Sequence, residues 1–350
     1  MTAPAPASGG PGTADPDDVL VVEDLEVQFA TDRGWATVVE EVSFSVPRGS
    51  TVGIVGESGS GKSVTSLAIM GLIPSPPGRI VKGRIRLDGT ELVGRKESEL
   101  SDIRGDRMAM VFQEPMTSLN PAYSVGDQIA EVVRRHRTVS RRAAVDRAVE
   151  AMDLVGIPNA RSRVRSYPHE FSGGMRQRVM IAMALSCEPS LLIADEPTTA
   201  LDVTIQAQIL EVLERAQAAV GSAIILITHD LGVVAGMADR VLVMYAGRAV
   251  EQGNVDDVFA NPRHPYTLGL LESLPRLDGE GHERLTPITG APPSLLHPPP
   301  GCPFHPRCQF VRPLCSEVLP ELRMVGGLGQ RSACHYAEEL EGRGAEVEAR

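Results

Sequence analysis

The sequence predicts an α/β fold that is interrupted by a helical insert and ends in a loop-rich extension. A short apolar strand at residues 51–55 runs directly into a glycine-rich loop at 56–63 and an apolar helix at about 63–72. Strand, glycine loop and helix in this order are typical of α/β folds that bind phosphate groups. Residues 123–186 show helical patterns and few strand signals, and short buried strands are predicted again after residue 190. This alternation indicates an α/β core with helices inserted into it.

The remaining elements follow in order along the chain. Residues 19–29 and 38–46 alternate apolar and polar side chains, as half-buried strands do. Buried strands are predicted at 191–194, 223–228 and 240–245, and a helix with an apolar face between Ile205 and Ala216 separates the first two. These patterns divide the chain into a disordered leader at 1–18, an α/β domain at 19–262 with a helical subdomain at about 114–188, an extension at 263–337 and an acidic tail at 338–350.

Composition narrows the function classes. The 350 residues carry a net charge of −11, which argues against a nucleic-acid partner, because such proteins usually carry a positive footprint. No run approaches the roughly 18 apolar residues that a membrane-spanning helix needs. The first residues are rich in Ala, Pro and Gly and have no basic start or apolar centre, so we expect a disordered leader and not a signal peptide.

The glycine-rich loop carries the clearest chemical signal. It reads Gly56-Glu57-Ser58-Gly59-Ser60-Gly61-Lys62-Ser63 and fits the pattern of a phosphate-binding loop. Its glycines let backbone N–H groups turn toward phosphate oxygens, and the following helix offers its positive end. Lys62 is predicted to reach the β- and γ-phosphates of ATP, and Ser63 to take one Mg²⁺ position. The alternative is a glycine-rich turn without a ligand; the flanking strand and helix speak against it.

Two adjacent acids end the strand at 191–194. Asp195 and Glu196 lie where parallel strands of α/β sheets end, which is where such sheets bind ligands. Asp195 is predicted to hold Mg²⁺ through its water shell, and Glu196 to act as the general base on the attacking water. Two solvent-facing acids after a strand would be the structural alternative.

A third cluster, Ser172-Gly173-Gly174, precedes an apolar helix. Exposed N–H groups at a helix N-terminus form an anion site, although Ser-Gly-Gly alone is usually a simple N-cap. A single chain has no use for a second phosphate cradle without a lysine. We therefore predict that two subunits pack head to tail, so that Ser172 of one subunit caps the γ-phosphate held by Lys62 of the other.

The order of these clusters, with Gln177 completing the third, resembles the ATP-binding subunits of ABC transporters. The resemblance implies a P-loop NTPase core of the RecA-like type with an antiparallel β subdomain. It implies that Gln113 is a third Mg²⁺ ligand, in a loop that senses Mg²⁺ and touches the membrane subunits. It also implies that Asp202 lies in a dimer-contact loop and that His229 contacts the γ-phosphate. Taken alone, Gln113 would be read as a polar strand end and His229 as a helix cap. Phe171 stands where the family usually has leucine, another apolar residue, so we expect no loss of activity.

Adenine is expected to stack on an aromatic ring of an early strand. Phe29 is the first candidate and Trp35 the second. An aromatic residue at such a position is also common as part of a core.

Three segments resemble the di- and oligopeptide importers within this family. They are residues 191–206, residues 262–267 and the cysteine-containing stretch 301–335. The resemblance implies a second, related ATPase as partner, two membrane permease subunits and an extracellular peptide-binding protein. It places the chain at the cytoplasmic face of the membrane. Nickel or an antibiotic is the alternative cargo, and the core motifs do not distinguish import from export.

Other classes of ABC protein remain as rivals. Chromosome and DNA-repair ATPases usually separate their halves with long coiled coils, and this chain has no sustained heptads. Translation-associated members normally carry two ATPase halves on one chain. A regulatory subunit that binds nucleotide without cleaving it is disfavoured by Glu196 and His229.

Four of the five cysteines lie close together in the extension, at Cys302, Cys308, Cys315 and Cys334. Their spacing lacks the close pairs that zinc prefers, whereas a [4Fe–4S] cluster takes four cysteines from varied loops. Some members of the peptide-importer group are reported to carry such a cluster. An iron–sulfur cluster is the first expectation, and zinc and no metal are the alternatives. Cys187 is expected to be a small buried hydrophobic residue.

Overall fold

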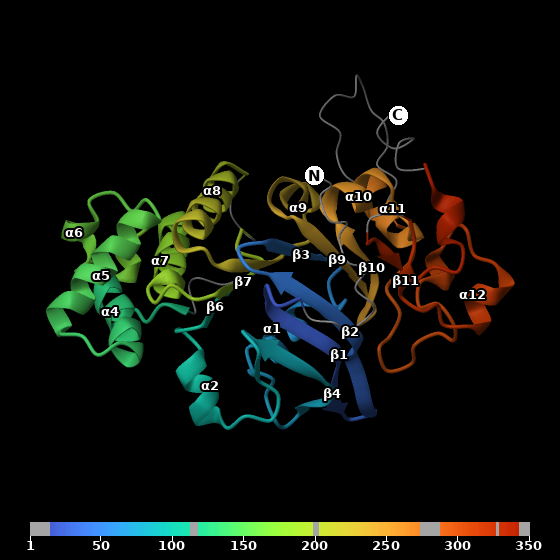
Figure 1. The fold of residues 1–350 in the computed structure, drawn as a ribbon, viewed down its shortest axis with the longest axis horizontal. Coiled ribbons are helices and arrows are strands. Elements are labelled where there is room, and N and C mark those ends of the chain that lie inside the picture. Colours follow the sequence, from blue (N-terminus) through green and yellow to red (C-terminus); the bar gives the residue numbers. More distant parts are fainter. Residues whose placement is uncertain (1–14, 113–117, 199–202, 274–287, 327–328, 343–350) are drawn as a thin grey trace, which may run out of the picture.

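The computed structural model describes residues 15–112, 118–198, 203–273, 288–326 and 329–342. These residues form two β-sheets, a separate group of helices and a C-terminal extension (Figure 1). The architecture confirms the predicted α/β class with an antiparallel subdomain and a helical insert.

The smaller sheet is antiparallel, with the strand order β2-β1-β4-β5. Its strands are β1 (Asp18–Thr31), β2 (Gly34–Pro47), β4 (Gly78–Leu87) and β5 (Thr90–Glu91). The long strands β1 and β2 alternate between buried and more exposed residues, as their sequence patterns predict. This alternation gives the sheet one apolar face, which packs toward the larger sheet.

The larger sheet has the strand order β11-β12-β10-β9-β3-β8-β7-β6. The five strands from β9 to β6 are parallel, and β10, β12 and β11 continue the sheet in antiparallel fashion. Its strands are β3 (Thr51–Val55), β6 (Met108–Val111), β7 (Leu191–Asp195), β8 (Ala223–Ile227), β9 (Arg240–Tyr245), β10 (Arg248–Asn254), β11 (Arg323–Met324) and β12 (Arg331–Ser332). Every residue of β3, β7 and β8 is buried, which matches their uninterrupted apolar sequences.

Helices cover this sheet and form the separate group seen beside it in Figure 1. The group comprises α4 (Val125–His136), α5 (Arg141–Leu154), α6 (Ala160–Arg163), the 3₁₀ turn η1 (Pro168–Glu170) and α7 (Gly173–Leu185). The other helices are α1 (Lys62–Ile69), α2 (Glu97–Ile103), α8 (Val203–Val220), α9 (Leu231–Met237), α10 (Val255–Ala260), α11 (Pro265–Glu272) and α12 (Pro313–Glu317). None of these described helices is long and apolar enough to cross a bilayer.

The two faces of the larger sheet bury different partners. Leu191 and Ile193 of β7 lie in a core that includes α1 and the antiparallel sheet. Leu192 and Ala194, which point to the opposite face, lie in a core with the helical group and α8. The end of β7 is therefore fixed from both sides, and with it the position of the acids that follow.

The extension joins the larger sheet at β10. Strand β12 pairs with β10 through Glu251 and Gln252. The fully buried Glu251 carboxylate accepts hydrogen bonds from the backbone N–H of Arg263 (2.6 Å) and of His264 (3.0 Å) and from Nε2 of Gln330 (2.8 Å). Burial raises the pKa of Glu251 to about 7, and these hydrogen bonds oppose the rise. This carboxylate thus ties β10, the start of α11 and the β11–β12 hairpin together.

The tail expected from residue 338 begins with three ion-paired carboxylates. Glu339 pairs with Arg312, Glu338 with Arg323, and Glu341 with Arg263. The described part of this segment therefore lies against the extension, with Ala337–Leu340 forming the 3₁₀ turn η3.

Candidate active site

The phosphate loop connects β3 to α1, as predicted. Gly56 and Gly61 both have positive φ, at 149° and 102°, and a Cβ at either position would collide with backbone oxygens. At Gly56 that oxygen belongs to Met244 of β9, 2.2 Å away, and at Gly61 to Val38 of β2, 2.8 Å away. Only glycine fits these positions. The backbones of β9 and β2, one from each sheet, thus pack directly against the loop.

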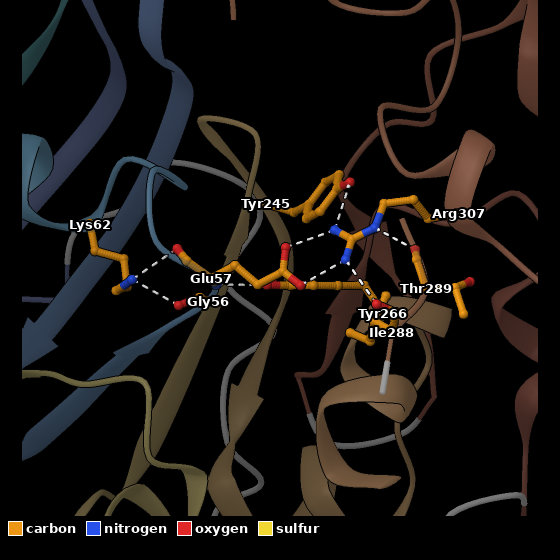
Figure 2. A network of polar contacts seen from close by, with 8 residues as sticks. All are labelled: Gly56, Glu57, Lys62, Tyr245, Tyr266, Ile288, Thr289 and Arg307. Carbon is orange, nitrogen blue, oxygen red and sulfur yellow. Dashed lines mark hydrogen bonds and ion pairs between the residues drawn. The ribbon is translucent and has the colours of Figure 1, made fainter. Parts of the chain in front are cut away.

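Lys62 lies in the first turn of α1 with its ammonium turned back over the loop (Figure 2). Its Nζ donates hydrogen bonds to the carbonyl oxygens of Gly56 (2.7 Å) and Glu57 (3.0 Å). Burial lowers the pKa of Lys62, while the nearby carboxylates of Glu196, Asp195 and Glu57 raise it. A buried ammonium at the mouth of a glycine loop has the position and charge to bind a phosphate.

Other groups of the loop also fit a triphosphate. The Ser60 hydroxyl is buried, and among the described residues it has no hydrogen-bond partner. A buried polar atom without a partner is costly, and a phosphate oxygen would satisfy it. Ser58, Gly59 and Ser63 are exposed along the same loop. The residues present therefore fit the phosphates of ATP.

A hydroxyl and a carboxylate at the end of β7 fit Mg²⁺. The Ser63 hydroxyl donates a hydrogen bond to Oδ1 of Asp195 at 3.2 Å, although 132 residues separate them in the chain. Asp195 is buried, which raises its pKa, while the Ser63 hydrogen bond and the Lys62 charge lower it. Oxygen ligands of this kind are the ones Mg²⁺ prefers. The structure thus brings together two of the three predicted magnesium ligands.

Glu196 and His229 meet at the carboxyl ends of neighbouring strands. Asp195 of β7 is opposite Ile227 of β8, and the Glu196 N–H donates to the Ile227 carbonyl at 2.9 Å. Glu196 has a positive φ of 46°, a conformation that costs a non-glycine residue free energy and is frequent at functional sites. Its Oε1 lies 3.8 Å from Nδ1 of His229, whose side chain is largely exposed. The carboxylate and the imidazole therefore lie together at the carboxyl edge of the sheet.

Ser172 caps α7, which packs against α5, α8 and β6 within and beside the helical group. Its hydroxyl accepts a hydrogen bond from the Met175 N–H at 3.4 Å, as an N-cap does. A Cβ on Gly174 would lie 2.7 Å from Ile205 of α8, whereas a Cβ on Gly173 would meet nothing within 4 Å. Ser172 and Gly173 are exposed, so this end of α7 is open to a ligand or a second subunit.

The other predicted site residues are Gln113, Asp202 and three aromatic residues. Gln113 and Asp202 lie outside the described residues, so their assigned roles stay predictions. Phe29 is half-buried and packs against the main core, and the exposed Trp35 has the Arg79 guanidinium 3.7 Å from its ring centre. Stacking of either ring on adenine also stays a prediction. Phe171 is buried, as an apolar replacement for leucine would be.

The four extension cysteines line one cavity of about 70 Å³. Burial raises the pKa of Cys302, Cys308 and Cys334 to about 11, which favours the protonated thiols. Within the described part of the chain, no three His, Cys, Asp or Glu side chains are placed to hold a metal ion. The expected iron–sulfur cluster is therefore not supported. Cys187 is buried in the helical group, as predicted.

Sequence reasoning missed a contact between the extension and the phosphate loop (Figure 2). Both guanidinium Nη atoms of Arg307 donate to the Glu57 carboxylate, at 2.7 Å and 2.9 Å, and Nη1 also lies 3.3 Å from the Tyr245 hydroxyl. The Tyr266 hydroxyl accepts a hydrogen bond from the Glu57 N–H at 2.8 Å. Arg307 and Glu57 are 250 residues apart, so no local pattern could have indicated this pair.

Comparison with known proteins extends these findings. Residues 39–199 match the family model described as "ABC transporter", and residues 250–315 match "Oligopeptide/dipeptide transporter, C-terminal region". The oligopeptide transport ATP-binding protein OppD of Bacillus subtilis is 55% identical over 91% of this chain and 88% of its own length. The dipeptide transport ATP-binding protein DppD of the same organism is 54% identical over 86% of this chain and 90% of its own length.

Solved structures show the same fold. CbiO1 of Clostridium perfringens, part of the ABC transporter complex CbiONQ, has a TM-score of 0.60 at 29% identity, over 70% of this chain and 91% of its own. The dimeric ABC transporter cassette MJ0796 has a TM-score of 0.60 at 24% identity, over 67% of this chain and 98% of its own.

Proposed function

Because this chain belongs to the ATP-binding subunits of oligopeptide and dipeptide ABC transporters, we propose that it drives peptide import by binding and hydrolysing ATP within a pair of such subunits. The observation that carries the proposal is the meeting of Lys62, Ser63 and Asp195 at one edge of the sheet, with Glu196 and His229 beside them. The site supplies a phosphate cradle, oxygen ligands for Mg²⁺ and a carboxylate to act on water.

In the proposed mechanism each group of residues has a separate role. The loop N–H groups and the Lys62 ammonium bind and orient the phosphates, and Ser63 and Asp195 would hold Mg²⁺, which when bound neutralises phosphate charge. Glu196 takes the proton of the attacking water, and His229 contacts the γ-phosphate. These residue roles are proposals supported by the geometry.

A second subunit completes the site in this proposal. The exposed N-terminus of α7, with Ser172 and Gly173, would cap the γ-phosphate held by the partner's loop. We propose that the partner is a related but non-identical ATPase. The ATPase pair would lie on the cytoplasmic face of the membrane with two permease subunits, and an extracellular peptide-binding protein would deliver the cargo.

Reconstitution tests the function directly. The chain should be assembled in lipid vesicles with the proposed partner ATPase, two permeases and the binding protein. We expect MgATP-dependent uptake of short peptides, and hydrolysis that is stimulated by the peptide-loaded binding protein. ATP-dependent uptake of nickel or an antibiotic without peptide uptake would replace the cargo assignment, and absence of nucleotide hydrolysis would overturn the ATPase role.

An iron–sulfur cluster bound by the four extension cysteines is a separate hypothesis. The four thiols share one cavity, but the described side chains do not form a metal-binding group. If a cluster is present, protein purified without oxygen will be brown and contain iron and sulfide, and Cys308→Ser will lower both. Colourless protein without iron or sulfide, or unchanged iron in the variant, would exclude it. Zinc content measured on the same samples separates the zinc alternative.

A further inference from the structure

Glu57 places a negative charge within the loop that has to receive a triphosphate. Its backbone carbonyl accepts a hydrogen bond from Lys62, and its carboxylate is close enough to act on the pKa of that lysine. Its side chain is 25% exposed, so solvent screens the charge only in part. An unpaired carboxylate at this position would oppose the binding of ATP phosphates by like-charge repulsion.

Arg307 neutralises that charge from the C-terminal extension. Its side chain is only 5% exposed and makes two parallel hydrogen bonds to the two oxygens of Glu57. Bidentate pairs between arginine and a carboxylate are among the strongest and most directional polar contacts in proteins. Further hydrogen bonds to the carbonyl oxygens of Thr289 (3.0 Å) and Ile288 (3.4 Å) fix the guanidinium in place (Figure 2).

A second contact holds the backbone of the same loop residue. The Tyr266 hydroxyl accepts a hydrogen bond from the Glu57 N–H, which is therefore directed toward α11. The extension thus both neutralises the Glu57 carboxylate and fixes the orientation of the Glu57 backbone. Tyr266 itself is fully buried against Tyr245 and Phe304, with ring centres 4.6 Å and 5.4 Å away.

The extension does not depend on Arg307 for its attachment. The β12–β10 pairing, the Glu251 hydrogen bonds and the packing of Tyr245, Tyr266 and Phe304 join it to the core independently. A change at Arg307 therefore acts on the loop contact and leaves these other contacts in place.

We propose that Arg307 is a positioning residue for ATP: it neutralises Glu57 and fixes the phosphate loop, so that the C-terminal extension sets the affinity of the nucleotide site. The proposal rests on the ATP-binding function proposed above. It assigns to the extension a role in nucleotide binding that is exerted through Glu57, in addition to any role in assembly.

The test is a charge-rescue experiment on the full chain, using MgATP as the probe in titration calorimetry. Arg307→Ala should weaken ATP binding about tenfold, which corresponds to about 1.4 kcal/mol. The double variant Arg307→Ala/Glu57→Gln should recover most of the lost affinity, because it removes the charge that Arg307 no longer balances. Both variants lack the same arginine side chain, so a folding defect caused by that loss would persist in the double variant.

Arg312→Ala is the matched control, because it removes another extension arginine, whose partner Glu339 lies in the adjoining C-terminal segment and not in the phosphate loop. It should bind MgATP like the wild type. In the assembled transporter, Arg307→Ala should raise the KM for ATP about tenfold with little change in kcat, as expected for lost ground-state binding. Wild-type affinity in Arg307→Ala, or no recovery in the double variant, would overturn the proposal. A wild-type chain that binds no MgATP would instead overturn the proposed function.

Discussion

Glu196→Gln should bind MgATP about as tightly as the wild type and hydrolyse it about 10²- to 10⁴-fold more slowly, the range that general-base catalysis supplies. An amide cannot take the proton of the attacking water, but it has nearly the same shape as the carboxylate. The Glu196 N–H would keep its hydrogen bond to the Ile227 carbonyl, so the unusual backbone conformation is retained. We expect a long-lived closed dimer with the partner ATPase, measured by single-turnover hydrolysis and size-exclusion chromatography with ATP.

Glu188→Gln is the matched control for this variant. Glu188 also has a positive φ, 55°, but its carboxylate pairs with Arg147 outside the site. It should hydrolyse ATP at the wild-type rate. If Glu196→Gln, assembled with its partner, also hydrolyses ATP at that rate, the general base is another group.

Lys62→Ala should lose most nucleotide binding. The ammonium would make charge-assisted hydrogen bonds to phosphate, and such bonds contribute about 1.5–3 kcal/mol each. Loss of one therefore weakens binding by about tenfold or more. Hydrolysis should fall further, by about 10²- to 10³-fold, because the same charge stabilises the transferring phosphoryl group. Calorimetric titration with MgATP and steady-state hydrolysis measure the two effects.

Lys82→Ala serves as the control for Lys62→Ala. Lys82 lies on β4 with about half of its side chain exposed, and its ammonium is 3.9 Å from Asp24. Its removal should change neither binding nor hydrolysis. ATP affinity at the wild-type level in Lys62→Ala would contradict the assignment of the phosphate loop.

The sequence predicts the half-buried strands β1 and β2 and the buried strands β3, β7, β8 and β9, but it does not predict β4. Strand β3 matches its prediction, and β7 and β8 each differ by one residue, because a strand buried on both faces has an uninterrupted apolar sequence. Strand β4 was not predicted; it carries four basic residues along a partly exposed surface and forms through pairing with β1. A strand without an alternating or uninterrupted apolar pattern depends on its neighbours in the sheet, and a local pattern does not encode those neighbours.

The candidate site divides in the same way. The phosphate loop and the Asp195–Glu196 pair are contiguous motifs with fixed chemistry, and the structure brings Ser63 and Asp195 together as expected. Tyr266 belongs to the segment 262–267, which resembles the peptide importers. Nothing in that segment indicates that the Tyr266 hydroxyl contacts the phosphate loop. Such contacts arise from tertiary packing.

The pairing of β12 with β10 bears on where the chain can be divided. A fragment ending at residue 262 would leave β10 as the last strand of the larger sheet, with unpaired backbone groups and a buried carboxylate stripped of its N–H donors. Unprotected sheet edges recruit strands from other molecules. The ATPase domain and the extension thus contribute strands to one sheet, and dividing the chain at residue 262 would break that sheet.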